Sequence, residues 1–205
     1  MANHLLIFAR HPALGLVKTR LAATLGNEEA LRIYRELLVR TRIAADGVVA
    51  HKTLWLAGEA PATGSEYADW TNYEQRPQST GDLGERMHQA FATAFAGGVT
   101  AAVIIGTDCP ELSSDLLQAA FEQLTTHNVV AGPARDGGYY LLGMKALVPD
   151  FFANKAWSTD AVLSATLADA ERLGLSVALL PMLSDVDNAK DFAAWQERAA
   201  AAVSE

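Results

Sequence analysis

Short apolar runs alternate along the chain with longer segments of helical periodicity. Residues 5–9 are apolar on both faces, which is typical of a strand buried between two layers. Between residues 28 and 45 the apolar positions recur every three or four residues, which predicts an amphipathic helix. The same reading predicts further strands at 48–56, 103–105, 129–131, 139–144 and 176–181, and further helices at 83–96, from Ser113 or Ser114 to Leu124, at 160–173 and at 189–202. This alternation predicts a three-layer α/β fold with a largely parallel sheet.

Residues 59–81 are the least regular stretch of the chain, with Pro61, Gly64, Pro77 and Gly81. A connection of this length in a compact domain is often a lid or a binding loop. The sequence contains no internal repeat, and we expect residues 1–205 to form a single domain.

Composition narrows the classes of function. The net charge of −8 argues against binding to nucleic-acid phosphates, and the single cysteine, Cys109, excludes an internal disulfide and a cysteine-rich zinc site. The first apolar run ends at Arg10 and is too short for a signal peptide or a membrane span. We therefore expect a cytoplasmic protein with no membrane partner. The four tryptophans and the apolar helix faces suit a core or an interface equally, so the oligomeric state stays open.

Polar residues that follow the strands mark the expected site, because open α/β sheets bind ligands beyond the carboxyl ends of their strands. Arg10, Lys18 and Arg20 share a loop containing Pro and Gly after the first strand, and three cations on one loop suit a polyphosphate. Ordinary solvated surface charge is an equally good explanation of this loop alone. The glycine spacing of a Walker or dinucleotide loop is absent.

Acidic residues follow two later strands. Asp108 stands at the end of a buried strand, where a carboxylate either holds a divalent cation or organises the turn. In an extended segment Asp185 and Asp187 point to the same side and Val186 to the other, and two such carboxylates repel unless a cation joins them. The alternative is that Asp187 or Asn188 caps the last helix.

Two segments containing glycine complete the set of candidates. Residues 80–87 place backbone amides and Arg86 at the start of a helix, where an anion or a ribose and base can bind. Residues 135–140 form a tight turn that can approach a ligand closely, although composition alone favours a simple hairpin. The five histidines have no metal-ligand spacing, and no G-x-S-x-G elbow of a serine hydrolase is present.

Five ordered segments resemble a known family: FARHPALGLVKTRLA, STGDLGERM, IIGTDCP, ARDGGYYLLG and the late DVD. They are similar to the glycosyltransferase-like DUF2064 proteins, which include arsenosugar-biosynthesis-type glycosyltransferases. The resemblance covers nearly the whole chain. It implies the three-layer α/β/α GT-A fold of nucleotide-diphospho-sugar transferases, with a mixed, mostly parallel sheet.

The resemblance also implies roles for individual residues. Asp108 stands where GT-A enzymes place the metal-binding acid of their D-x-D motif, which is reduced here to Thr-Asp-Cys. Asp185 and Asp187 would supply the missing ligands of Mg²⁺ or Mn²⁺. Arg10, Lys18 and Arg20 would meet the pyrophosphate. The nucleoside side would consist of Gly81, Asp82, Gly84 and Arg86. The sugar and acceptor side would consist of Asp136 as the base that deprotonates the acceptor, with Gly137, Gly138, Tyr139, Trp157, Ser158 and Thr159.

The leading hypothesis is a metal-dependent glycosyltransferase that moves a sugar from a nucleotide-diphospho-sugar to a small acceptor. The alternative is a nucleotidyltransferase that condenses a nucleoside triphosphate with a small phosphorylated acceptor, because Lys-Thr-Arg-Leu at residues 18–21 resembles the phospholactate guanylyltransferase pattern. The glycine-rich loop with Arg and Met that is usual in sugar nucleotidyltransferases is missing, which counts against this alternative. A non-catalytic nucleotide-binding module is the third reading. In every case the partners are a nucleotide or nucleotide sugar and a small molecule.

Overall fold

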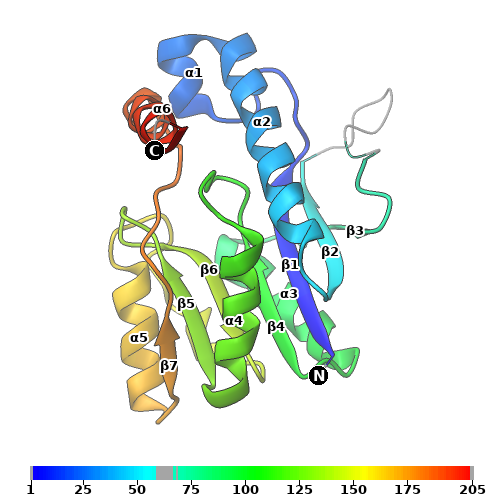
Figure 1. Ribbon diagram of the computed structural model, residues 1–205. Helices are drawn as coiled ribbons and strands as arrows, with labels where there is room; N and C mark the ends of the chain where they lie inside the picture. Colours follow the sequence, from blue (N-terminus) through cyan, green and yellow to red (C-terminus); the bar gives the residue numbers. More distant parts are fainter. Residues whose placement is uncertain (1, 59–66, 68, 204–205) are drawn as a thin grey trace.

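A computed structural model describes residues 2–58, 67 and 69–203, which form one sheet with helices on both faces (Figure 1). The strands are β1 (Asn3–Arg10), β2 (His51–Ala57), β3 (Glu74–Pro77), β4 (Ala101–Ile105), β5 (Val129–Pro133), β6 (Tyr139–Met144) and β7 (Val177–Leu179). The helices are α1 (Thr19–Leu25), α2 (Asn27–Asp46), α3 (Leu83–Ala96), α4 (Ser114–Thr126), α5 (Val162–Arg172) and α6 (Ala189–Val203), with a 3₁₀ turn η1 (Pro149–Phe151).

The sheet is mixed and mostly parallel, as expected. Its order is β3-β2-β1-β4-β6-β5-β7, and β6 runs antiparallel to both of its neighbours. All the other pairs are parallel. Because β5 runs parallel to β4, the turn from β5 into β6 lies at the same edge as the carboxyl ends of the parallel strands, which is the upper edge in Figure 1.

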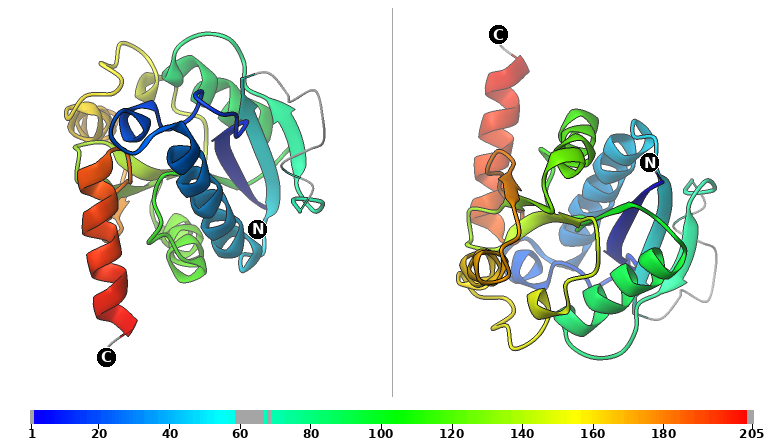
Figure 2. Two further views of the ribbon diagram at one scale, coloured as in Figure 1. Left: turned by 90° about the horizontal axis from the view of Figure 1, so that it is seen from above. Right: turned by 90° about the horizontal axis from the view of Figure 1, so that it is seen from below.

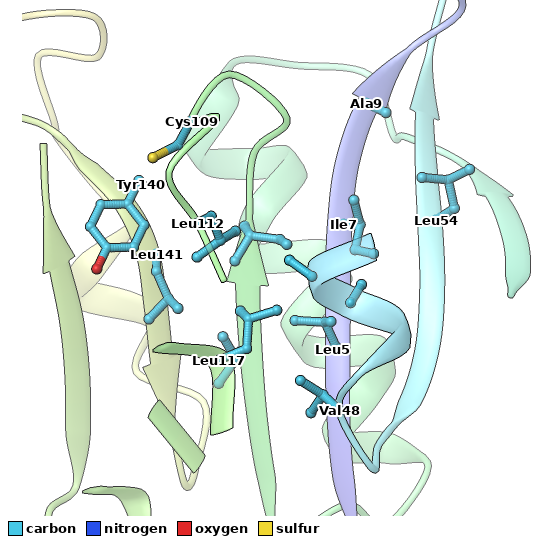
Figure 3. Close-up of a cluster of buried hydrophobic side chains, with 14 of the residues drawn as sticks. Leu5, Ile7, Ala9, Val48, Leu54, Cys109, Leu112, Leu117, Tyr140 and Leu141 are labelled. Atoms are coloured by element: carbon cyan, nitrogen blue, oxygen red, sulfur yellow. The ribbon is translucent and has the colours of Figure 1, made fainter. Parts of the chain in front are cut away.

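Alternation along the strands divides the core between the two faces of the sheet. Leu5 and Ile7 of β1 are fully buried in a cluster with residues of α2 and α4 (Figure 3). Leu6, between them, is fully buried on the other face with Phe91 of α3 and Phe151 of η1. The sheet therefore lies between two helical layers (Figure 2), and the three-layer prediction is confirmed.

A third, smaller cluster lies above the carboxyl edge, where α6 packs against α1 and α2. Val186 is fully buried in it beside Leu21 and Trp195. The Asn188 side chain begins α6 by accepting hydrogen bonds from the amides of Lys190 and Asp191. Of the two residues considered from the sequence, Asn188 is therefore the one that caps α6. No helix among the described residues is long and apolar enough to cross a membrane.

Two elements were not expected from the sequence. β3 lies within the stretch of residues 59–81, and the loop prediction is wrong for this part. Its sequence, Glu-Gln-Arg-Pro, has no apolar alternation because β3 is an edge strand. Residues 59–66 and 68 of that stretch lie outside the described residues. The other element, α1, turns the end of the basic loop into a short helix that begins directly after Lys18.

A buried histidine makes stability depend on pH. The Nε2 atom of His4 lies 2.8 Å from the Oγ1 atom of Thr53, and burial, together with the nearby His51, lowers the pKa of His4 to about 4. In the unfolded chain a histidine titrates near pH 6.5. Between these two values the unfolded state binds a proton that the folded state excludes, so the free energy of unfolding falls as the pH falls.

We expect this loss to disappear in His4→Asn. The free energy of unfolding of both proteins is measured with urea at several pH values between 7.5 and 4.5. Subtracting the values of the variant from those of wild type cancels the pH dependence that the carboxylates contribute to both proteins. The matched control is His127→Asn, at the residue directly after α4. Parallel pH profiles for wild type and His4→Asn would contradict the expectation.

Candidate active site

A cleft of about 760 Å³ opens at the carboxyl edge of the sheet. Its walls come from the loop after β1, the start of α1, the first turns of α3, the loop after β4, the β5–β6 turn, residues 157–160 and the segment before α6. The charged residues that line it are Arg10, Lys18, Arg20, Arg86, Asp108, Asp136, Asp160, Asp185 and Asp187. The predicted basic loop and the predicted acids therefore share one cleft.

Two tyrosines hold the backbone at the end of β1. The Tyr34 hydroxyl accepts from the Arg10 amide at 2.8 Å and lies 3.1 Å from the Arg10 carbonyl oxygen, to which the Tyr67 hydroxyl also donates. The side chain of Arg10 therefore extends from a rigid point. On α3, the Arg86 guanidinium donates a hydrogen bond to the Gln78 side chain at 3.0 Å. Burial and the charge of Arg10 lower the pKa of Arg86, so the two guanidinium groups are close enough to repel.

The arginines of the cleft differ from most of the described arginines elsewhere on the protein. Among the described residues, Arg10, Arg20 and Arg86 form no ion pair with a carboxylate, whereas Arg32 and Arg172 each bridge two acidic residues. Guanidinium groups that lie together without carboxylate partners are suited to bind an anion with several oxygens, such as a diphosphate.

Lys18 occupies a different position from the one expected. Its side chain is only 5% exposed, and its Nζ atom lies 2.7 Å from Asp108 Oδ1, 3.2 Å from Asp187 Oδ1 and 2.7 Å from the Val186 carbonyl oxygen. Its backbone has a φ of 49°, a left-handed conformation that costs free energy in a residue with a side chain. Burial opposes the ammonium charge, but the two carboxylates outweigh it and raise the pKa of Lys18. Lys18 therefore lies between two of the expected metal ligands.

One ammonium does not balance the acids around it. Burial and the nearby Asp108, Asp136 and Asp187 raise the pKa of Asp185 to about 7, although Lys18 acts in the opposite direction. The described residues contain no group of three or more His, Cys, Asp or Glu side chains already arranged to hold a metal. The donor set is nevertheless rich in carboxylate oxygens and short of positive charge, which fits a hard divalent cation.

Cys109, beside Asp108, has no catalytic character. Its side chain is in the core cluster of Figure 3, and burial together with Asp185 raises its pKa to about 12. The thiol therefore stays protonated at neutral pH and is not a nucleophile.

The β5–β6 turn lines the cleft beside the segment before α6, where Ala134 pairs with Leu183. The Asp136 carboxylate accepts from the Gly138 amide at 2.9 Å, which fixes the turn. Gly137 has a φ of 89°, and a Cβ atom there would lie 2.2 Å from the Asp160 carbonyl oxygen. Only glycine allows the turn and residues 157–160 to lie this close. The Leu163 amide ties the two together by donating to the Gly137 carbonyl oxygen at 3.1 Å.

Trp157 packs closely against the first turn of α3. A Cβ atom on Gly84 would lie 2.5 Å from the Trp157 ring and 2.7 Å from the Phe152 carbonyl oxygen. The fit is so close that the indole Nε1 atom is buried without a hydrogen-bond partner among the described residues. Gly84 therefore positions Trp157 and has no room for a larger residue.

We expect Gly84→Ala to displace Trp157 from its position against α3. Overpacking of this kind costs about 1–3 kcal/mol of stability, and the fluorescence spectrum should change with the environment of the indole. Gly106→Ala is the matched control, because a Cβ atom at Gly106 meets nothing within 4 Å. Equal melting temperatures and spectra for the two variants would contradict the expectation.

The structure brings most of the expected site residues together. The cleft is lined by Arg10, Lys18, Arg20, Arg86, Asp108, Asp136, Gly138, Tyr139, Trp157, Ser158, Thr159, Asp185 and Asp187. Four others are not among its lining residues: Gly81, Asp82, Gly84 and Gly137. Asp82 instead caps α3, where it forms a capping box with Glu85. Gly84 and Gly137 instead allow close packing, Gly84 against Trp157 and Gly137 against Asp160.

Several lining residues were not named as candidates, and three polar ones among them show why. Tyr34 reads in the sequence as part of the apolar stripe of α2, because its hydroxyl reaches the cleft only through the fold. Gln78 stands in an irregular stretch that carries no periodic signal. Asp160 reads as the start of a helix, and only its position beside the wall residues 157–159 marks it as part of the site.

Comparison with known proteins places the chain in a family. The family described as "Uncharacterized protein conserved in bacteria (DUF2064)" matches residues 40–159. No curated protein matches the chain. A crystal structure from Desulfovibrio desulfuricans G20, provisionally described as a nucleotide-diphospho-sugar transferase, is 31% identical, with a TM-score of 0.85 over 92% of this chain and 84% of that one.

More distant structures share the fold alone. Rv0371c from Mycobacterium tuberculosis H37Rv, in complex with manganese, is 15% identical with a TM-score of 0.57 over 94% of this chain and 96% of that one. Glucosyl-3-phosphoglycerate synthase from the same species, with Mg²⁺ and uridine diphosphate, is 11% identical with a TM-score of 0.54 over 90% and 70%. The fold is that of nucleotide-diphospho-sugar transferases and related nucleotidyltransferases.

Proposed function

Because this chain belongs to the DUF2064 family, we propose that it is a transferase that moves a sugar from a nucleotide-diphospho-sugar to a small acceptor with the help of Mg²⁺ or Mn²⁺. One observation carries the proposal. A single cleft holds arginines without carboxylate partners and a group of carboxylates with too little positive charge. A diphosphate and a divalent cation together supply the two kinds of partner that these groups lack.

The arginines serve the leaving group. When the bond between the sugar carbon and the phosphate oxygen breaks, the electron pair stays on that oxygen and a nucleoside diphosphate leaves. Arg10 and Arg86 face each other where they can donate hydrogen bonds to its phosphates. Charge that develops during the reaction is stabilised most by donors that are already in place, and the tyrosines on the Arg10 backbone provide that rigidity.

The acids have two tasks. Asp108, Asp185 and Asp187 are the side chains that would hold the cation, which on binding supplies Lewis-acid stabilisation of the diphosphate. Lys18 already lies between Asp108 and Asp187, so it stabilises their negative charge before any ligand arrives. Asp136, on the β5–β6 turn, lines the same cleft and would accept the proton from the acceptor hydroxyl as that oxygen forms its bond to the sugar.

Calorimetric titration tests the proposal. Uridine, guanosine, cytidine, adenosine and thymidine diphosphates and their common sugar derivatives are each added with and without Mn²⁺. We expect at least one of them to bind, and to bind more tightly with Mn²⁺. No binding to any of these compounds would refute the proposal.

The reaction product separates the proposal from nucleotidyl transfer. A glycosyltransferase releases a nucleoside diphosphate from its donor, whereas a nucleotidyltransferase releases pyrophosphate from a nucleoside triphosphate. Detection of pyrophosphate, with no nucleoside diphosphate formed from any sugar donor, would favour the second activity. Metal-dependent binding without either product would favour a non-catalytic nucleotide-binding module.

A further inference from the structure

We infer that the acceptor is a hydroxyl-bearing molecule without a phosphate group. The inference rests on the proposed function and concerns one wall of the cleft, which we call the acceptor wall: Asp136, Tyr139, Trp157, Ser158, Thr159 and Asp160. Its charge differs from that of the remainder of the cleft. A phosphorylated acceptor needs cations that this wall lacks.

The cations of the cleft all come from other segments. Arg10 lies at the end of β1, Lys18 and Arg20 lie at the start of α1, and Arg86 lies on α3. The Lys18 ammonium is already engaged by two carboxylates. The Arg86 side chain points to Gln78, on the β3 side of α3, whereas Gly84 of the same helix contacts Trp157. These cations are therefore placed for one diphosphate.

The acceptor wall carries two carboxylates and no cation among its described residues. Asp136 and Asp160 are both exposed to solvent. Their backbones are held together at Gly137, where the Asp160 carbonyl oxygen leaves no room for a Cβ atom. Arg135 precedes Asp136 in the sequence but is not among the residues that line the cleft.

Electrostatics then decides between acceptor classes. Two unit charges 4 Å apart interact by about 1 kcal/mol in water and by more near a protein surface. A phosphate dianion between Asp136 and Asp160, which both line the cleft, would be repelled by both carboxylates. We therefore expect a phosphate group to weaken the use of an acceptor by roughly tenfold or more.

The remaining side chains of the wall suit hydroxyl groups. Trp157 and Tyr139 are partly exposed aromatic residues that line the cleft, and Ser158 and Thr159 are exposed hydroxyls that can donate and accept hydrogen bonds. Ser158 has a φ of 64°, a left-handed conformation that the surrounding structure must hold in place. Such a combination of aromatic surface, hydroxyls and carboxylates is suited to a polyol or a sugar.

Paired acceptors test the inference with the full-length protein. Glycerol is compared with glycerol 3-phosphate, and glucose with glucose 6-phosphate, using the nucleotide sugar that binds in the titration above. We expect kcat/KM for the unphosphorylated member of a pair to be at least about tenfold higher. Equal or preferred transfer to the phosphorylated members overturns the inference. Transfer to none of the unphosphorylated compounds while the donor binds also overturns it.

A charge reversal provides a second test. In Asp160→Lys, we expect the ratio of kcat/KM between each pair to shift toward the phosphorylated member by roughly tenfold, and in Asp160→Asn by less. Asp115→Lys, on the exposed start of α4, is the matched control and should leave the ratio unchanged. An unchanged ratio in Asp160→Lys contradicts the inference. Donor affinity is measured in parallel, because a failure to bind any donor refutes the proposed function itself.

Discussion

Asp108→Asn should lower kcat/KM for sugar transfer by roughly 10² to 10³ while the protein stays folded, an effect of the size seen when a key electrostatic group is removed. The substitution keeps the shape of the side chain but removes the charge that faces Lys18 at 2.7 Å. The cluster of Asp108, Asp185 and Asp187 then offers one fewer anionic ligand to a cation. We therefore expect nucleotide affinity to lose most of its dependence on Mn²⁺.

Steady-state kinetics and calorimetry with and without Mn²⁺ check this expectation. Asp115→Asn is the control, because Asp115 is an exposed acid at the start of α4 and is not among the residues that line the cleft. If Asp108 merely organises the turn after β4, the substitution should reduce stability and leave the Mn²⁺ dependence of the remaining protein unchanged. That result would remove Asp108 from the site.

Lys18→Met should destabilise the protein and make it respond more strongly to divalent cations. Loss of the ammonium leaves Asp108, Asp185 and Asp187 without their nearest positive charge. Because the carboxylates of Asp108 and Asp187 are 43% and 41% exposed, the cost is lower than for a fully buried pair, and we expect about 2–3 kcal/mol. A cation that binds the folded state then recovers part of this loss.

Lys155→Met offers a closely matched comparison. The Lys155 side chain is also 5% exposed and also forms an ion pair, with Asp169, away from the cleft. Both variants should lose stability, but Mn²⁺ at millimolar concentration should raise the melting temperature of Lys18→Met alone by several degrees more than that of wild type. Equal shifts in all three proteins would show that Lys18 and the cation do not share the same carboxylates.

The main elements of the fold could be predicted because buried positions appear in the sequence as apolar runs or as apolar residues at helical spacing. Residues 5–9 are buried on both faces and read as apolar throughout, and α2 shows its buried stripe at helical spacing. β3 shows no such apolar pattern because its side chains are mostly exposed at the edge of the sheet. α1 is also hard to read from the sequence, because only one of its side chains, Leu21, is buried.

The sequence pointed to most of the charged residues that line the cleft but not to how they are arranged within it. Strand ends place Arg10 and Asp108 at one edge, and the period of two places Asp185 and Asp187 on one side of their segment. The contact of Lys18 with Asp108 and Asp187 joins positions about 90 and 170 residues apart in sequence, and no local pattern encodes it. The same holds for Gly84, whose role depends on a tryptophan from a distant loop.

The connection between Val186 and the body of the protein has a consequence for biosynthesis. The Val186 amide donates to the Asp108 carbonyl oxygen at 2.8 Å, and its side chain is buried under α6. A ribosome releases the amino-terminal half first, so a growing polypeptide carries Lys18 and Asp108 well before their later acidic neighbours emerge. The ion pair between Lys18 and Asp187 therefore forms only after residue 187 has left the ribosome.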